Sequence, residues 1–326
     1  MSIQKNCILS FKSIPSFFLL ILSLLIFSCT NKVEALSIDE DPPKVFFTSN
    51  INSEGILSVF EALQVEPIGN VAIKVHTGEP GNVHYVKPDM IKDLVQRLNG
   101  TIVETNVAYG GPRSTTASHL QVASDHGFTD IAPVLILDSV DDISFPVSAG
   151  KHLPENLVGG LFNDFDFHVV ISHFKGHQMG GFGGALKNIS IGYASASGKR
   201  LIHAGGKPGG NIWGTDQIVF LESMVEAAKT ITENTKDRIV YINIMNHLSV
   251  DCDCSSSPVA PEMADIGILA SLDPVALDQA CVDLVFAAQD GAALRERIIS
   301  RQAIRTLEYA QELNIGSRDY QLVILP

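Results

Sequence analysis

Short apolar runs alternate along this chain with segments whose apolar residues recur at helical spacing. Uninterrupted apolar runs predict buried strands, and the helical period predicts amphipathic helices. The predicted strands are 44–49, 70–76, 100–106, 133–138, 166–173, 237–245, 264–271 and 320–325. The predicted helices are 54–63, 89–99, 115–127, 217–232, 274–288 and 292–313. This alternation predicts β-α-β units, and therefore an α/β fold with a mostly parallel, helix-covered sheet.

Polar loops follow four of these predicted strands. They come after residues 70–76, 100–106, 166–173 and 237–245. The carboxyl ends of parallel strands lie at the same edge of a sheet, where α/β proteins bind their ligands. The four loops are therefore expected to converge on one cleft.

The first 28 residues are typical of a secretory signal rather than of a folded segment. Lysines precede the apolar run 17–27, and Cys29 follows it where cleavage is expected. The sequence around Cys29 resembles a bacterial lipobox, which predicts lipidation and an anchor in a cell-envelope membrane. The alternative is a plain signal peptide with an incidental cysteine. Residues 29–43 are polar and end in two prolines, which predicts a tether before a single α/β domain at 44–326.

The formal net charge of −13 changes the list of expected partners. No basic stripe is present, which argues against a nucleic-acid partner. Membrane contact is expected through the lipid on Cys29 and not through a charged face. The few positive side chains in the predicted cleft therefore favour a small anionic ligand.

The loop at 172–188 combines two histidines, two lysines and five glycines. His173 and His177 are candidate ligands of a divalent transition metal. Lys175 and Lys187 are candidate catalytic residues that would hold an anion and stabilise developing charge. Exposed amides and a helix that starts nearby could also cradle an anion, with these candidate ligand-binding residues: Gly180, Gly181, Gly183, Gly184 and Asn188. The alternative is that the glycines serve only close packing.

The loop at 246–257 contains the sequence DCDC at 251–254, which offers two soft thiolate ligands and two hard carboxylate ligands for a metal ion. Asp251, Cys252 and Cys254 are candidate metal ligands, and Asp251 is also a candidate catalytic residue. Cys252 and Cys254 could instead form a redox pair, since a disulfide between residues so close would be strained and easily reduced. The third alternative is a polar loop with two unpaired thiols.

Other polar residues have weaker functional signals. Arg113, with Tyr109 nearby, could clamp a carboxylate or phosphate of a ligand. Asp273 precedes a proline at a predicted helix start and is expected to be an N-cap. Asp278 is expected at a solvated helix position.

Three blocks of the sequence carry a family resemblance: SHFKGHQMGGFGGALKNISIGYASASGK, DCDC and DIGILASLDPVALDQACVDLV. They resemble the family called domain of unknown function 362, often labelled iron–sulfur centre proteins. Many relatives carry a ferredoxin-like insert with closely spaced cysteines. The corresponding region here, 200–217, has no cysteine. This chain is therefore identified as a member without that insert, and a 4Fe-4S cluster is not expected.

Three functions follow from these observations as hypotheses. The first is a metal- or anion-dependent enzyme of the cell envelope, with a composite cleft formed by 172–188 and 246–257. The second is a lipoprotein that binds an anion without catalysis, and the third is a thiol redox partner that uses Cys252 and Cys254. The metal version requires His173 and His177 to share a site with the cysteine-containing loop.

Overall fold

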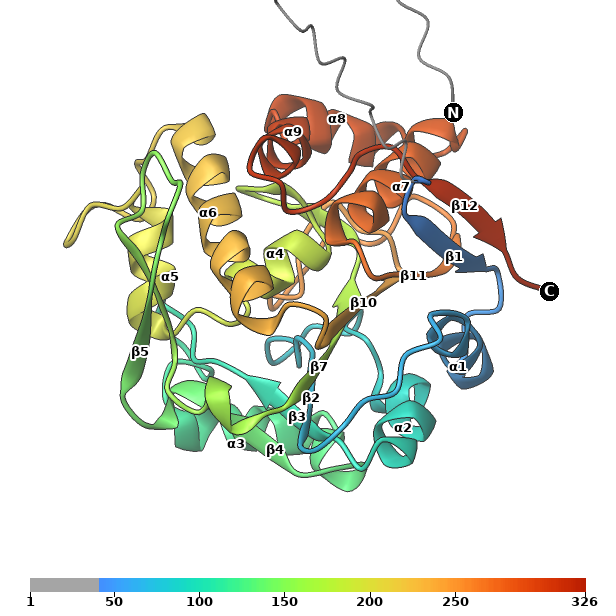
Figure 1. Cartoon of the computed structure of the whole chain (residues 1–326), viewed down its shortest axis with the longest axis horizontal. Coiled ribbons are helices and arrows are strands. Elements are labelled where there is room, and N and C mark those ends of the chain that lie inside the picture. Colours follow the sequence, from blue (N-terminus) through green and yellow to red (C-terminus); the bar gives the residue numbers. More distant parts are fainter. Residues whose placement is uncertain (1–40) are drawn as a thin grey trace, which may run out of the picture. The chain divides into compact units, whose positions relative to one another are not determined.

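An eight-stranded sheet forms the centre of the computed structural model, which describes residues 41–326 (Figure 1). Its strands lie in the order β12-β1-β11-β10-β7-β2-β3-β4. In chain order they are β1 (Lys44–Thr48), β2 (Val71–Lys74), β3 (Thr101–Glu104), β4 (Val134–Ile136), β7 (Phe167–His173), β10 (Ile239–Met245), β11 (Gly267–Ser271) and β12 (Gln321–Ile324). Neighbouring strands are parallel except in the two pairs that contain β11. The predicted α/β fold with a mostly parallel sheet is confirmed.

Helices cover both faces of the sheet because its central strands are apolar on both sides. In β7, Val169 and Ile171 join one hydrophobic cluster, and Val170 joins the other. The first cluster includes side chains of α1 (Ser53–Ala62), α2 (Pro88–Arg97) and α3 (Thr116–Asp125). The second includes side chains of α4 (Ala185–Ser190), α6 (Gln217–Thr235), α7 (Pro274–Ala287), α8 (Ala292–Ser300) and α9 (Ile304–Glu312).

Several short elements have no counterpart in the predicted set. They are β5 (Asp142–Pro146), β6 (Glu155–Gly159), β8 (Lys175–His177), β9 (Gly181–Gly183), α5 (Ala196–His203) and the 3₁₀ turns Phe128–Asp130, Leu137–Ser139 and Phe162–Asp164. β5 pairs with β6, and β8 with β9, each as an antiparallel hairpin outside the main sheet. β8 and β9 have three residues each, which is too short to show a hydrophobic period, so the sequence pattern could not reveal these two strands.

The predicted single helix at 292–313 is wrong, because the structure has two helices there. α8 ends before Arg301, and Gln302 adopts a left-handed backbone with φ of 51°. The amide of Ala303 then turns back and donates to the carbonyl of Ile298 at 3.0 Å. The β8–β9 hairpin packs against this break, where a side chain on Gly181 would clash with Ala303.

Asp278 is not at a solvated position, which corrects the sequence-based expectation. It is fully buried on α7, and its carboxylate caps the start of α4. The amides of Ala185 and Leu186 donate to it at 2.8 and 2.9 Å, and Asn243 Nδ2 donates at 2.7 Å. Burial raises the pKa of Asp278 to about 6, although the bonds from Leu186 and Asn243 oppose the shift. A carboxylate of the chain itself therefore occupies the amides that the sequence offered to an anion.

Asp273 is confirmed as the N-cap of α7, where it accepts from the amides of Val275 and Ala276. The predicted signal peptide, the lipidation site Cys29 and most of the tether lie outside the described residues and stay predictions. Among the helices within 41–326, none is both long and apolar enough to cross a bilayer.

The Asp278 cap can be tested by the Asp278→Ala substitution. It leaves three buried donors without their acceptor, and each such donor costs roughly 1–3 kcal/mol. We expect the free energy of unfolding, measured in urea, to fall by about 3 kcal/mol or more. Glu296→Ala, at an exposed acid of α8, is the control and should change it by less than about 0.5 kcal/mol. Equal losses in both variants would contradict the cap.

Candidate active site

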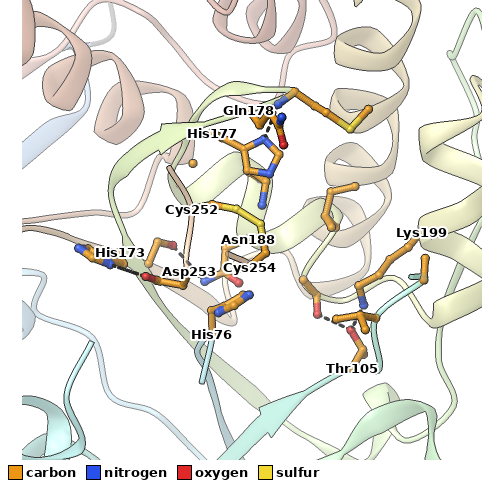
Figure 2. Close-up of a pocket in the computed structure, with 18 of the residues that line it drawn as sticks. His76, Thr105, His173, His177, Gln178, Asn188, Lys199, Cys252, Asp253 and Cys254 are labelled. Carbon is orange, nitrogen blue, oxygen red and sulfur yellow. Dashed lines mark hydrogen bonds and ion pairs between the residues drawn. A yellow bond between two sulfur atoms is a disulfide. The ribbon is translucent and has the colours of Figure 1, made fainter. Parts of the chain in front are cut away.

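A cavity of about 380 Å³ lies at the carboxyl ends of β2, β3, β7 and β10 (Figure 2). These four strands are neighbours in the sheet and run parallel. The loops that follow them supply most of the wall, as their position after the strands predicted. The ionisable side chains and cysteines that line the cavity are Lys74, His76, Glu104, Tyr109, Arg113, His173, Lys175, His177, Lys187, Lys199, His203, Cys252, Asp253 and Cys254.

Asp253 is the buried carboxylate at the centre of this site. Lys175 donates to its Oδ1, and His173 Nδ1 lies 3.0 Å from its Oδ2. Burial alone would raise the pKa of Asp253, but Lys175 and His173 outweigh burial and hold that pKa well below its usual value. The positive charge of Lys175 is thus already balanced by the chain itself.

His173 does not offer a free nitrogen to a metal ion. Its Nε2 donates to the carbonyl of Asn246 at 2.6 Å, while its Nδ1 faces Asp253. A metal ligand needs an unshared lone pair on one ring nitrogen. In this arrangement His173 positions the cysteine-containing loop, so we no longer assign it as a ligand.

Asp251 lies outside the cavity, unlike the nearby Asp253. Its carboxylate accepts from the amide of Val259 at 3.1 Å and lies 3.7 Å from Arg297 Nη1. The structure therefore does not bring Asp251, predicted as metal ligand and catalytic residue, together with the residues that line the cavity. Asp251 and Asp253 are two residues apart and look equivalent in sequence. Only the path of the loop decides which of the two carboxylates lies in the cavity.

Cys252 and Cys254 form a disulfide in the cavity wall, and His177 lies beside it. The ligand atoms of these three residues are within 4.8 Å of one another. His177 Nδ1 accepts from the amide of Gly180 at 2.8 Å. Burial, and then Lys187, keep the pKa of His177 well below its usual value, so the ring is neutral.

A neutral imidazole that accepts through Nδ1 carries its hydrogen on Nε2. His177 lies close to the disulfide in Figure 2. With Nδ1 accepting from Gly180 and a hydrogen on Nε2, the ring has no free lone pair for a metal ion. Together with the oxidised cysteines, this geometry does not fit a metal ion held by His177, Cys252 and Cys254.

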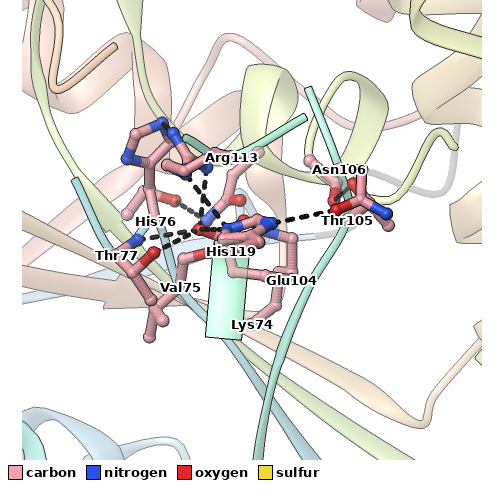
Figure 3. A network of polar contacts seen from close by, with 12 residues as sticks. Lys74, Val75, His76, Thr77, Glu104, Thr105, Asn106, Arg113 and His119 are labelled. Carbon is pink, nitrogen blue, oxygen red and sulfur yellow. Dashed lines mark hydrogen bonds and ion pairs between the residues drawn. The ribbon is translucent and has the colours of Figure 1, made fainter. Parts of the chain in front are cut away.

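Arg113 and Tyr109 contact carboxylates of the chain itself, and Figure 3 shows Arg113 beside Glu104. Arg113 donates to Glu104 Oε1 at 3.0 Å and to Glu79 Oε1 at 3.2 Å. Tyr109 donates to the same Glu79 oxygen at 2.8 Å, and Lys74 lies 3.3 Å from Glu104 Oε2. Burial would raise the pKa of Glu104, but Lys74 and Arg113 hold it well below its usual value. The predicted clamp exists, but it holds internal carboxylates.

Most glycines of the 172–188 loop serve close packing. A side chain on Gly176 would clash with the carbonyl of Val250, and one on Gly184 would clash with Asp278. Gly180 and Gly181 do not line the cavity, whereas Gly183, Gly184 and Asn188 do. Asn188 Nδ2 donates to the carbonyl of Ile171 at 3.1 Å, so it also ties α4 to β7.

Lys187 differs from the other cavity lysines. Within residues 41–326 its Nζ has no hydrogen bond and no carboxylate within ion-pair distance. Burial, Lys175 and Lys74 lower its pKa to about 8. Its ammonium group is thus the cavity cation that lacks a partner among the described residues.

Lys199 is a buried amine on α5 that the sequence pattern did not reveal. Its Nζ donates to the carbonyl of Ala194 at 2.7 Å and to Thr105 Oγ1. Burial lowers its pKa to about 7. Nothing in the sequence around it distinguishes this lysine from a surface lysine, because its burial depends on the loop after β3.

The cavity carries an excess of positive charge although the protein is acidic. Five cationic side chains line it, namely Lys74, Arg113, Lys175, Lys187 and Lys199, against the carboxylates of Glu104 and Asp253. A low-dielectric, cationic cavity favours an anionic ligand.

The chain is thus an α/β protein with a cationic cavity at the carboxyl edge of its sheet, where proteins of this class bind their ligands. Residues 71–283, more than half of the chain, match the family model "Domain of unknown function (DUF362)". The chain belongs to this family, which confirms the resemblance seen in its sequence. No curated protein sequence gives a significant match.

Several solved structures are similar to this chain, and two of them are described here. One is the lactate racemase apoprotein from Thermoanaerobacterium thermosaccharolyticum, with 16% identity and a TM-score of 0.43, covering 74% of this chain and 56% of that one. The other is a protein from Thermotoga maritima, with 14% identity and a TM-score of 0.41, covering 80% of this chain and 58% of that one. The chain thus spans just over half the length of each.

The iron–sulfur label of the family does not fit the donor set of the described residues. Cluster ligation requires free thiolates. Cys252 and Cys254 are bonded to each other, and Cys281 is buried against Asn243.

The buried ion pair can be tested by substituting its two partners. Lys175→Met should lower the free energy of unfolding by about 3–5 kcal/mol, because it leaves Asp253 buried without its main counter-ion. Adding Asp253→Asn removes that charge, so the double variant should be more stable than Lys175→Met alone. Urea unfolding measures Lys175→Met, Asp253→Asn and the double variant, with the exposed Lys207→Met as control. Strictly additive losses would show that the two side chains are not coupled.

Proposed function

We propose that this protein is an enzyme that binds a small organic anion in the cavity and moves a proton on it. The observation that carries the proposal is Lys187, a cavity ammonium group without a partner among the described residues. Lys74, Arg113 and Lys175 pair with carboxylates of the chain itself, so an anion beside Lys187 would complete the charge balance of the site. The ligand would contact Lys187 and the nearby Asn188.

Lys199 supplies the proton acceptor in this proposal. Its pKa of about 7 leaves a substantial fraction of neutral amine at neutral pH, which a general base requires. Two hydrogen bonds, to Ala194 and Thr105, hold the amine in place and leave its lone pair available. Lys187 would meanwhile stabilise negative charge that develops on the substrate.

The anion-binding role of Lys187 is testable by thermal shift against small carboxylates and phosphates. A ligand at a hundred times its Kd stabilises a protein by about 2.7 kcal/mol. At least one anion should raise the melting temperature of the wild type, and Lys187→Met should bind it at least about tenfold more weakly. Lys207→Met, at an exposed lysine, should bind as the wild type does. A flat panel, or equal binding by Lys187→Met, would contradict the proposal.

The catalytic role of Lys199 is testable with the anions that bind. In D₂O the wild type should exchange a carbon-bound proton of one of them, as followed by NMR. The exchange rate should rise as the pH increases through about 7, because Lys199 then loses its proton. Lys199→Met should keep binding but exchange about a hundredfold more slowly, since general bases contribute at least this much. Binding without exchange by the wild type would instead support the alternative, a non-catalytic anion-binding protein.

A further inference from the structure

The disulfide between Cys252 and Cys254 lines the ligand cavity instead of lying in the core. We propose that it is a redox-active couple, reduced and reoxidised by an external dithiol that reaches it through the cavity. This inference goes beyond the proposed anion chemistry and does not rest on it.

Access separates this pair from the remaining cysteine of the described residues. Cys252 and Cys254 are partly exposed and contribute to the cavity wall. Cys281 is fully buried on α7, where Asn243 Nδ2 lies 3.4 Å from its sulfur. Thiol–disulfide exchange requires an attacking thiolate to reach a sulfur atom, and only the cavity pair permits that approach.

The loop that carries the disulfide is held by contacts that do not involve sulfur. Asp253, between the two cysteines, is anchored by Lys175 and His173. Its carbonyl accepts from the amide of Glu79 at 2.9 Å, and Arg297 donates to the carbonyl of Val250 at 2.6 Å. Because these bonds survive reduction, the two thiols would stay close enough to reoxidise.

The surroundings of the sulfur atoms favour a thiolate. A ring nitrogen of His177 lies within 4.8 Å of them, and because Nδ1 accepts from the amide of Gly180, the group that this ring can offer a sulfur atom is the N–H of Nε2. The cavity also contains Lys187, whose ammonium has no partner among residues 41–326. Nearby cations and hydrogen-bond donors stabilise a leaving thiolate and so speed exchange.

The reaction balances as a two-electron exchange. One thiolate of the external dithiol attacks a cysteine sulfur, forms a mixed disulfide and breaks the Cys252–Cys254 bond. The other cysteine leaves as a thiolate, which accepts a hydrogen bond from His177 and takes a proton from solvent. The second thiol of the reductant then closes its own disulfide and releases the first cysteine. Two electrons pass to the protein, and the dithiol is oxidised.

Thiol counting on the folded full-length chain tests the couple. Protein is equilibrated in buffers of graded reduced and oxidised dithiothreitol, alkylated with a maleimide and weighed by mass spectrometry. We expect two additional labels to appear reversibly in the wild type and to be missing in the Cys252→Ser/Cys254→Ser variant. Sulfurs that react only after unfolding would mark a purely structural disulfide and overturn the proposal. Full labelling before any reductant is added would overturn it as well.

Two substitutions separate the donor role of His177 from its structural role. His177→Asn keeps an acceptor near the Gly180 amide but is too short to bring an N–H to the sulfurs. His177→Gln places an amide N–H near the position of Nε2. We expect the rate of reduction to fall about tenfold in the Asn variant and to recover in part in the Gln variant. His84→Gln, outside the cavity, is the control and should react as the wild type does; equal rates in all variants would overturn the role of His177.

Discussion

The ion pair between Lys175 and Asp253, with His173 beside it, is the interaction on which the rest of the site depends. It joins the end of β7, the hairpin strand β8 and the loop that follows β10. β8 directly follows β7, but the loop after β10 is distant from both in sequence and meets them because β7 and β10 are parallel neighbours. A buried carboxylate without counter-ions would be strongly unfavourable, so the loop can close over the cavity only when Asp253 meets Lys175. Closing it also fixes where the disulfide and His177 lie.

A second constraint is the burial of several charges at one edge of the sheet. Glu104 is paired with Lys74 and Arg113, and Asp253 with Lys175. Most of the buried charges therefore belong to ion pairs within the chain, and these ion pairs hold the loops in place. Lys187 and Lys199 have no carboxylate partner, and burial lowers the pKa of each. The paired cations therefore have a structural role, and the cations without a carboxylate partner are the candidates for ligand binding and catalysis.

The glycine-rich segment illustrates how packing can imitate a ligand site. Its amides at the start of α4 look available to an anion in sequence, but Asp278 occupies them from α7. Gly176, Gly181 and Gly184 lie where a side chain would clash with Val250, Ala303 and Asp278. The same glycines let the hairpin and α4 pack closely enough to form the cavity wall. Their effect on any ligand is therefore indirect.

The sequence by itself determined the order of the strands and helices, the parallel sheet and the convergence of four loops. These depend on hydrophobic periodicity and on the direction of parallel strands, and both are local or topological properties. Tertiary structure alone decided that Asp253 rather than Asp251 enters the cavity, that Asp278 is buried, and that Lys199 faces the site. Each of these depends on which side chains from distant segments meet. Burial and counter-charge, which set the pKa and the role of an ionisable group, arise only from that meeting.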